Sequence, residues 1–286
     1  MKSSKPFNLL KSRFTHLPRR IFWPNELSQF LSEHRREWGA STVSIEELVK
    51  LLIQEKLVTR AEFKSNTYET IVRYVHGKHS NEELALSLQR DSFLSHGTAL
   101  AIHGLAAPEN TIYVNREQSP KDRSVEITQV GLKLAFKNKQ RQSRYIFNHS
   151  AVQYMLLNGK HTGRAGVKRT KTTSGETVDV TNKERTLIDA VVRPAYAGGI
   201  ERVADAYAAG ANGIDIDHMI DLLQRLDHAY PYHQAISFLL ERAGRSSTDC
   251  QKFEALGKKF DFYLDYGMKH PDFNKKWRLY YPLSLD

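Results

Sequence analysis

Apolar positions in the first third of the chain recur at helical spacing and then change to alternation. After Pro24, a stripe of apolar and aromatic residues predicts a helix that ends near Gly39. The segment 45–57 carries apolar residues at i, i+3, i+4 and i+7, which predicts an amphipathic helix. Two alternating segments, 58–64 and 68–75, flank a short polar turn and predict a β-hairpin.

This order of helix, turn, helix and hairpin is that of a winged helix-turn-helix. In such a module the helix before the hairpin enters the DNA major groove, and the hairpin, called the wing, contacts the phosphate backbone. Other small α+β domains show the same order of elements, so DNA binding must also be judged from the exposed side chains of this segment. We expect residues 1–80 to form a winged helix DNA-binding domain with a basic N-terminal arm.

The rest of the chain predicts a larger domain in which strands and helices are mixed. The S-x-x-E pattern of Ser80 with Glu83, and T-x-x-E of Thr181 with Glu184, predict capping boxes at two helix starts. Strands are expected at 111–115, 144–147, 151–157, 166–168 and 176–180. Helices are expected at 125–138, with an apolar face of Ile127, Val130 and Leu134, and at 199–209, 215–228 and 232–243. The predicted fold class is α+β, with an N-terminal winged helix-turn-helix followed by a larger mixed α/β domain at 81–286.

The composition narrows the class of protein. Of the 286 residues, 40% are hydrophobic and 26% are charged, which excludes wholesale disorder. No uninterrupted apolar segment is long enough to cross a bilayer, and the basic, polar N-terminus lacks the apolar core of a secretory signal. The single cysteine, Cys250, excludes an internal disulfide framework. We therefore expect a cytoplasmic protein without a membrane partner.

The net charge of +10 is concentrated in two zones. The first 20 residues contain six Lys and Arg residues and no carboxylate, and residues 127–175 contain ten and again no carboxylate. Such a field suits a polyanion, because neutralising phosphates releases counterions and supplies most sequence-independent affinity. The alternative is a solvated basic face that only aids solubility.

The candidate DNA contacts are basic or hydroxyl-bearing residues of the N-terminal arm, the second helix and the hairpin. Hydroxyls and backbone N–H groups at a helix start suit phosphate, whereas Glu46, Glu47 and Glu55 on the same helix would repel it. The set is Arg19, Arg20, Ser41, Thr42, Ser44, Lys50, Lys56, Arg60, Lys64 and Arg73. The second basic zone supplies a further polyanion surface: Lys133, Lys137, Lys139, Arg141, Arg144, Arg164, Lys168, Arg169 and Lys171.

The chain shows no recognised catalytic motif. The histidines do not follow a metal-ligand spacing, and no phosphate-loop, dinucleotide-binding or nucleophile-elbow pattern occurs. A metal-dependent nuclease would need clustered carboxylates with a lysine. The densest candidates are Glu176, Asp179, Lys183, Glu184 and Asp189. Because Glu184 is explained by the capping box, we favour structural roles and expect no enzyme, no metal and no cofactor.

Long segments of the chain resemble the AbiEi family of antitoxins. The resemblance rests on RYVHGKHSNEELALSLQRDSFLSHGTALAIHGL, TIYVNREQSP, VTNKERTLIDAVVRPAYAGGIERV and YPYHQAISFLLERAG, in that order. It covers most of the chain, from about Leu17 to Pro282. It implies a winged helix at 18–76 that represses the protein's own operon by binding inverted repeats in double-stranded DNA. It also implies an antitoxin domain at about 91–286.

The resemblance further implies a role in viral defence, as the antitoxin of a type IV toxin–antitoxin system. The antitoxin domain would oppose a nucleotidyltransferase-type toxin encoded downstream, without a stable complex between the two. The second basic zone then serves antitoxicity, a longer DNA footprint or another polyanion. The alternative from a different class is a metal-dependent nuclease, or other nucleic-acid enzyme, fused to a winged helix. A third is a scaffold that binds a partner protein through its helical end.

Overall fold

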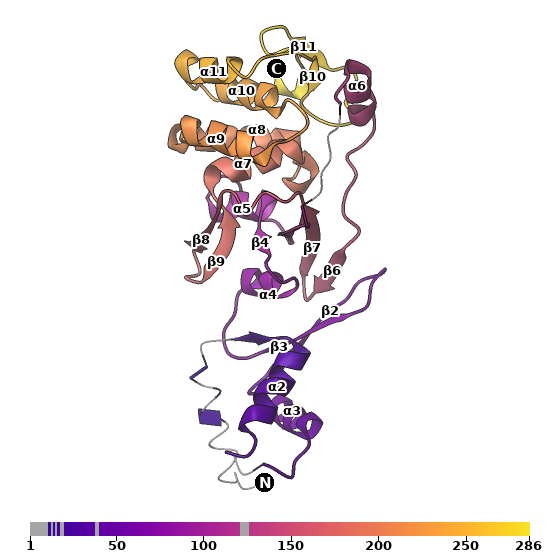
Figure 1. Ribbon diagram of the computed structural model, residues 1–286, viewed down its shortest axis with the longest axis vertical. Coiled ribbons are helices and arrows are strands. Elements are labelled where there is room, and N and C mark those ends of the chain that lie inside the picture. The colour runs from indigo at the N-terminus through magenta and orange to yellow at the C-terminus, as the bar shows by residue number, and fades with distance from the viewer. Residues whose placement is uncertain (1–10, 13, 15, 18–19, 38–39, 121–125) are drawn as a thin grey trace.

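The computed structural model describes residues 11–12, 14, 16–17, 20–37, 40–120 and 126–286. The molecule is elongated, with the N-terminal helices at one end and the C-terminal helices at the other (Figure 1). Helices and mixed sheets together make it an α+β protein, as predicted. None of the described helices has both the length and the apolar character needed to cross a membrane.

The N-terminal elements follow the predicted order of two helices and a hairpin. They are β1 (Ile21–Phe22), α2 (Pro24–His34), α3 (Ile45–Gln54), β2 (Thr59–Phe63) and β3 (Ile71–Val75). Pro24 opens α2 at a position where its missing N–H costs nothing. Ser44 caps α3, accepting from the Glu47 N–H at 3.2 Å, and the Glu47 carboxylate returns the bond at 3.1 Å. Strand β1 pairs with β3, which gives a small sheet of order β1-β3-β2.

A large mixed sheet occupies the middle of the molecule. Its strand order is β6-β7-β5-β4-β9-β8, with β5 parallel to β7 and β4 parallel to β9. The strands are β4 (Phe93–Leu94), β5 (Thr111–Glu117), β6 (Ile146–His149), β7 (Val152–Gly159), β8 (Val167–Lys171) and β9 (Thr177–Thr181). The helices within this part of the chain are α4 (Asn81–Ser87), α5 (His96–Ile102) and α6 (Gln129–Lys137). The strand predictions for 111–180 are therefore confirmed.

The C-terminal third packs helices around α7. They are α7 (Lys183–Val192), α8 (Ile200–Gly210), α9 (Ile216–Leu226), α10 (Tyr232–Arg242) and α11 (Ser247–Glu254). Helix α7 lies between the sheet and the other helices (Figure 1), and its Leu187 and Ile188 are fully buried. The chain ends with short strands β10 (Phe262–Tyr263), β11 (Asp272–Asn274) and β12 (Leu279–Tyr281). Short 3-10 turns lie at Pro194–Tyr196, Ala211–Gly213 and Leu283–Leu285.

Two local predictions were wrong. The residue that caps α7 is Asn182, whose side chain accepts from the Arg185 N–H at 2.9 Å; Thr181 belongs to β9, and its hydroxyl lies 2.7 Å from that of Thr186. In α6 the buried face consists of Leu132 and Phe136, whereas Val130 and Leu134 are 69% and 62% exposed. Phe136 stacks on Tyr266 from the C-terminal segment, which fixes the rotation of α6.

The hairpin β2–β3 is docked on the large sheet. The backbone of Lys64 exchanges two hydrogen bonds with that of Asn148, at 2.9 and 2.7 Å. Phe63 packs edge-on against Tyr154 with ring centroids 5.1 Å apart, and Tyr68 stacks on Tyr145 at 4.5 Å. Side chains of the hairpin are therefore part of the same hydrophobic cluster as those of β5, β7 and β9, so the core continues across residue 80.

Gly166 provides a test of how tightly α7 is held against the sheet. Its φ of +73° is left-handed, and a Cβ there would lie 2.8 Å from the Arg185 Cβ. We expect Gly166→Ala to lower the free energy of unfolding by about 2–4 kcal/mol, from backbone strain plus overpacking. Chemical denaturation of the full-length protein measures this.

Gly163 is the matched control for this substitution. Its φ of +62° is also left-handed, but a Cβ there would meet nothing within 4 Å. Gly163→Ala should therefore show only the backbone cost of about 1–2 kcal/mol. Equal losses in the two variants would show that the close approach to Arg185 contributes nothing.

Candidate functional site

The candidate DNA contacts gather around the start of α3. Ser41, Thr42 and Lys50 are exposed there, whereas the hydroxyl of Ser44 is used by the helix cap. Lys56 follows the helix in a left-handed conformation and is also exposed. Arg20 is exposed beside β1; Arg19 lies outside the described residues. The structure thus brings most of the α3 set to one end of the molecule (Figure 1).

The basic residues of the hairpin lie in different environments. Arg60 lies at the open end of the hairpin, where Thr59 pairs with Val75 beside β1, and its guanidinium forms an ion pair with Glu62. Lys64 is at the opposite end, where the hairpin tip is docked on β6; its side chain is exposed, but its backbone is bonded to Asn148. The hairpin is therefore fixed to the large sheet at Lys64 and Tyr68, whereas Asn66 and Thr67 of its turn remain exposed.

Arg73 is not available to DNA in this structure. It is 3% exposed, and its guanidinium donates to the carbonyls of Ser87 at 2.9 and 2.8 Å and of Leu88 at 3.3 Å. The same group lies 3.9 Å from the centre of the Trp23 ring. Burial lowers the pKa of Arg73 to about 10, so the side chain stays charged at neutral pH. Its function is to join β3, α4 and the start of α2.

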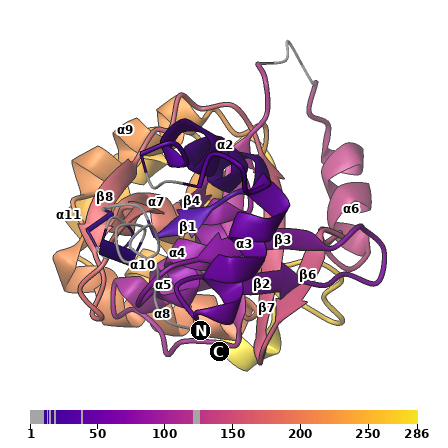
Figure 2. The ribbon, with the colours of Figure 1, turned by 90° about the horizontal axis from the view of Figure 1, so that it is seen from below.

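The acid-free stretch 127–175 does not form one surface. Strands β6 and β8 are the two edges of the large sheet and lie on opposite sides of the molecule (Figures 1 and 2). One group of basic residues lies on α6, on the flank of the molecule, and in the segment leading to β6: Lys133, Lys137, Lys139, Arg141 and Arg144. The other group lies on β8 or just before it: Arg164, Lys168, Arg169 and Lys171.

The β8 group lies on the same side as the N-terminal elements. Arg169 lines a hollow together with Arg20 and Arg90, which adjoins β1 and α2. The Arg169 guanidinium makes a long contact with the Asp179 carboxylate, at 4.0 Å. The Arg164 guanidinium is bound more closely: it pairs with Asp179 at 2.6 Å and donates to the Asp91 backbone carbonyl at 2.7 Å. The same hollow is lined by Glu26, Glu83, Asp91 and Asp179, so Arg169 lies on a surface of mixed charge, while Lys168 and Lys171 are exposed cations on the same strand.

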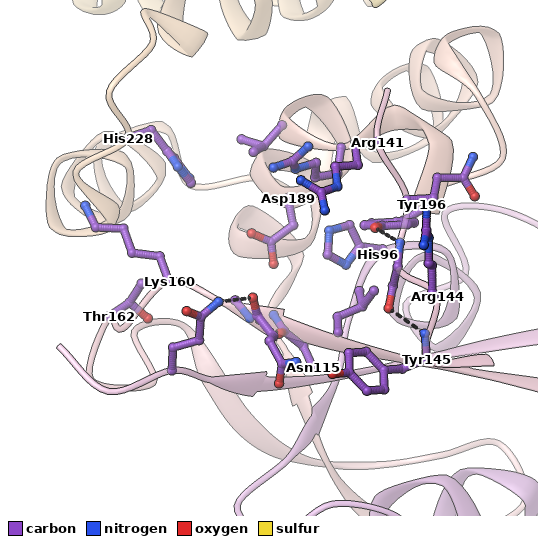
Figure 3. A pocket seen from close by; sticks show the side chains of 18 of the residues that line it. His96, Asn115, Arg141, Arg144, Tyr145, Lys160, Thr162, Asp189, Tyr196 and His228 are labelled. Carbon is purple, nitrogen blue, oxygen red and sulfur yellow. Dashed lines mark hydrogen bonds between the residues drawn. The ribbon is translucent and has the colours of Figure 1, made fainter. Parts of the chain in front are cut away.

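The α6 group leads into a pocket of about 750 Å³ (Figure 3). The pocket lies at the carboxyl ends of the parallel strands β5 and β7, against one side of α7. In open α/β sheets, ligands bind at such strand ends. Arg141, Arg144 and Arg193 line it and are exposed, and Tyr68 of the hairpin also reaches it.

The floor of the pocket contains a buried ion pair. The Arg185 Nε donates to Asp189 Oδ1 at 2.8 Å, and Arg185 and Asp189 are each 5% exposed. The second oxygen, Asp189 Oδ2, is buried and has no hydrogen-bond partner among the described residues. The Nε2 of His228, which also lines the pocket, is likewise buried without a partner in the described part of the chain.

Two neutral imidazoles flank the Asp189 carboxylate (Figure 3). Burial lowers the pKa of His96 to about 4, against the opposing effect of Asp189. Burial does the same to His228, whose pKa is also about 4. His96 Nδ1 lies 2.8 Å from the Ser95 hydroxyl, and its ring packs edge-on against Tyr196 at 5.4 Å. At neutral pH the pocket therefore has a cationic mouth and an interior in which one oxygen of the Arg185–Asp189 ion pair, Asp189 Oδ2, lacks a partner among the described residues.

The sequence analysis missed this pocket. Its residues come from α5, β5, the segment before β6, α7 and the loop after α9, which are far apart along the chain. One signal was present: Arg185 and Asp189 have the i, i+4 spacing at which opposite charges on a helix pair, and in the structure this pair is buried. Asp189 was instead considered as a member of a nuclease cluster.

The nuclease candidates do not gather. Glu176 is bonded to Thr172, Asp179 to Arg164, and Glu184 to the Asp215 N–H. The segments that the structure describes contain no group of three His, Cys, Asp or Glu residues placed to hold a metal ion. Each of these carboxylates thus has a structural partner of its own among the described residues.

Comparison with known proteins gives a fold but no family. No protein-family model and no curated protein matches the chain. The fold is similar to that of the RV2827C protein from Mycobacterium tuberculosis, with a TM-score of 0.63 and 12% sequence identity. The match covers 98% of this chain and 92% of that one, so the N-terminal and C-terminal parts occur together in both.

Substitution of Arg73 tests its reassignment from DNA contact to core residue. Arg73→Ala leaves the carbonyls of Ser87 and Leu88 without their donor, so we expect a loss of about 2–4 kcal/mol in unfolding free energy. Arg60→Ala, which removes a half-exposed arginine from the same hairpin, should change stability by less than about 1 kcal/mol. Thermal and chemical unfolding of full-length protein distinguish the two, and an Arg73 variant as stable as the Arg60 variant would contradict the assignment.

Proposed function

We propose that the protein is a DNA-binding antitoxin. Its N-terminal elements act as a winged helix that represses the protein's own toxin–antitoxin operon, in double-stranded DNA with inverted repeats. Its C-terminal part counteracts a nucleotidyltransferase-type toxin without a stable complex. The observation that carries the proposal is the capped helix α3, which presents exposed Lys50 and neighbouring hydroxyls at one end of the molecule.

The topology of the N-terminal part supports the DNA-binding half of the proposal. A strand before α2 pairs with the second strand of the hairpin, as the winged helix arrangement requires. Apolar residues of α2 and α3, such as Leu27, Leu31, Leu48 and Leu52, are buried against each other. The opposite side of α3, which carries Lys50, is exposed, and it is the face that we propose for the major groove.

The division of the basic stretch supports separate tasks for the two groups. The β8 group adjoins Arg20, so it extends the DNA footprint. The α6 group lies at the other edge of the large sheet and leads to the pocket, so it serves antitoxicity. The resemblance to AbiEi antitoxins supplies the identity of the antagonist.

The first test measures DNA binding by the full-length protein. Lys50→Ala and Arg60→Ala should each lower the slope of log affinity against log salt by about 0.9, because each removes one phosphate contact. Lys64→Ala is the control from the docked end of the hairpin, and it should leave the slope unchanged. Fluorescence anisotropy with the upstream DNA of the protein's own gene, and with random duplex, measures all three. If Lys64→Ala weakened binding as much as Arg60→Ala, our placement of DNA would be wrong.

A pair of charge-reversal variants tests the division of tasks. Reversal of Lys168, Arg169 and Lys171 to Glu should weaken operator binding and lower the salt slope by up to about three times 0.9. Reversal of Lys137, Lys139 and Arg141 should leave operator binding intact and abolish rescue of cells that express the toxin. Melting temperatures confirm that both variants fold.

The opposite result would overturn the assignment. If the Lys137, Lys139 and Arg141 variant lost operator binding but still rescued cells, DNA would bind on the α6 side and not at the β8 edge. A metal-dependent cut in the operator DNA would instead favour the nuclease interpretation. An absence of both operator binding and rescue in the unaltered protein would remove the antitoxin proposal.

A further inference from the structure

We propose that the pocket at the carboxyl ends of β5 and β7 binds a nucleoside polyphosphate. Its phosphates would lie on the arginines at the mouth, and a base N–H or sugar hydroxyl would donate to Asp189 in the interior. The site is separate from α3 and from the β8 cations, so it does not depend on the DNA-binding proposal.

The mouth of the pocket is suited to more than one phosphate group. Arg141, Arg144 and Arg193 all line it and are exposed, and none of them forms an ion pair with a carboxylate of the described residues. Lys160, by contrast, is neutralised by Asp227 at 2.7 Å. Guanidinium groups bind phosphate oxygens in pairs of hydrogen bonds. Several free guanidinium groups on one opening therefore match a di- or triphosphate better than a single phosphate.

The interior requires a ligand that can donate a hydrogen bond. Asp189 Oδ1 is occupied by Arg185, whereas Oδ2 is buried, unpartnered among the described residues and on the pocket floor. An ionised carboxylate only accepts, so its partner must bring an N–H or O–H group. A buried acceptor without a donor costs about 1–3 kcal/mol, which a bound ligand would relieve. Nucleosides carry neutral N–H and O–H donors on the base and on the ribose, whereas the only donors of inorganic phosphate or triphosphate are P–O–H groups on an anion, which the Asp189 carboxylate repels.

The walls and size of the pocket also fit a nucleotide. Leu157 and Val192 are apolar lining residues, and Tyr145 and Tyr196 add aromatic side chains to the lining. A volume of about 750 Å³ lies within the range of small-molecule sites. A base in duplex DNA is stacked and would have to be flipped out to reach Asp189. A free nucleotide can contact the arginines at the mouth and Asp189 in the interior without the free-energy cost of unstacking a base.

Calorimetric titration of the full-length protein tests the proposal. The probes are ATP, GTP, CTP and UTP, compared with inorganic triphosphate and with adenosine and guanosine. We expect at least one nucleoside triphosphate to bind about tenfold or more tightly than either of its halves, because each end adds charge-assisted hydrogen bonds. No binding by any of the four would overturn the proposal, as would triphosphate binding as tightly as the nucleotides.

Two double variants separate a built site from general attraction to positive charge. Arg141→Ala with Arg144→Ala should weaken nucleotide binding by about tenfold or more. Lys133→Ala with Lys137→Ala removes the same charge from α6, outside the pocket lining, and should change affinity by less than about twofold. Equal losses in the two variants would show binding by net charge and overturn the site.

Asp189→Asn tests the interior. Asparagine can keep an oxygen toward Arg185, so a melting temperature close to that of the unaltered protein confirms folding. The variant should lose the preference for nucleotide over inorganic triphosphate, and an unchanged preference would contradict the assigned function of Asp189. If it does not fold, the arginine variants decide the matter.

A competition experiment distinguishes a free nucleotide from the end of a longer strand. A single-stranded oligonucleotide should fail to displace the bound nucleoside triphosphate, and displacement at lower concentration than unlabelled nucleotide would overturn the proposal. Operator binding and toxin rescue are measured in separate experiments. Failure to bind nucleotide would therefore leave the antitoxin proposal intact, and failure to bind operator or to rescue cells would leave the nucleotide proposal intact.

Discussion

The buried Arg185 side chain connects the large sheet to the C-terminal helices. Besides its ion pair with Asp189, its Nη1 donates to the Ala165 carbonyl at 2.8 Å, so the segment before β8 is tied to α7. Gly166 permits this approach because it has no Cβ. Burying two charges is costly unless further hydrogen bonds satisfy them. The Arg185 guanidinium has such additional partners, whereas one oxygen of the Asp189 carboxylate has none among the described residues. Part of the desolvation cost therefore remains at Asp189 Oδ2, and Asp189 lines the pocket.

The hairpin gives the molecule a second connection, between its N-terminal end and the sheet. Phe63 and Val75 pack into the same core as Tyr154 and Val180, and the Lys64 backbone is bonded to that of Asn148. A hairpin held in this way has little freedom to adapt to DNA. Whatever α3 binds, its orientation relative to the large sheet is therefore set by contacts among β2, β3 and β6.

The sequence predicted the elements that depend on local signals. The period of apolar residues defined α2, α3 and the hairpin, and the side chain of Ser80 caps its helix as expected. Failures arose where two local choices were equally good. Thr181 and Asn182 both offer a capping oxygen, and the pairing of Thr181 within β9 decided between them.

The other failures concern contacts between distant segments. In α6, the stripes that contain Val130 or Leu132 have the same helical period, and packing of Phe136 on Tyr266 selected the second. Arg73 occupies an ordinary position in an alternating strand, but it is buried by α4 and Trp23. The pocket depends entirely on such contacts. In the sequence, the mouth of the pocket is visible only as basic residues, and its interior only as Arg185 and Asp189 at i, i+4 spacing.

The charge of the chain illustrates why position in space matters more than position in sequence. Residues 127–175 form one acid-free run, yet the sheet places its two halves at opposite edges. At the β8 edge the Asp179 carboxylate, which lies outside the run, pairs with Arg164, whereas Lys168 and Lys171 are exposed. At the other edge the free guanidinium groups of Arg141 and Arg144 stand at the mouth of a cavity that contains a carboxylate. A flat cationic surface suits an extended polyanion, whereas a cationic mouth above an acceptor suits a small ligand with both phosphates and hydrogen-bond donors. The two halves of one acid-free run thus suit two different kinds of ligand.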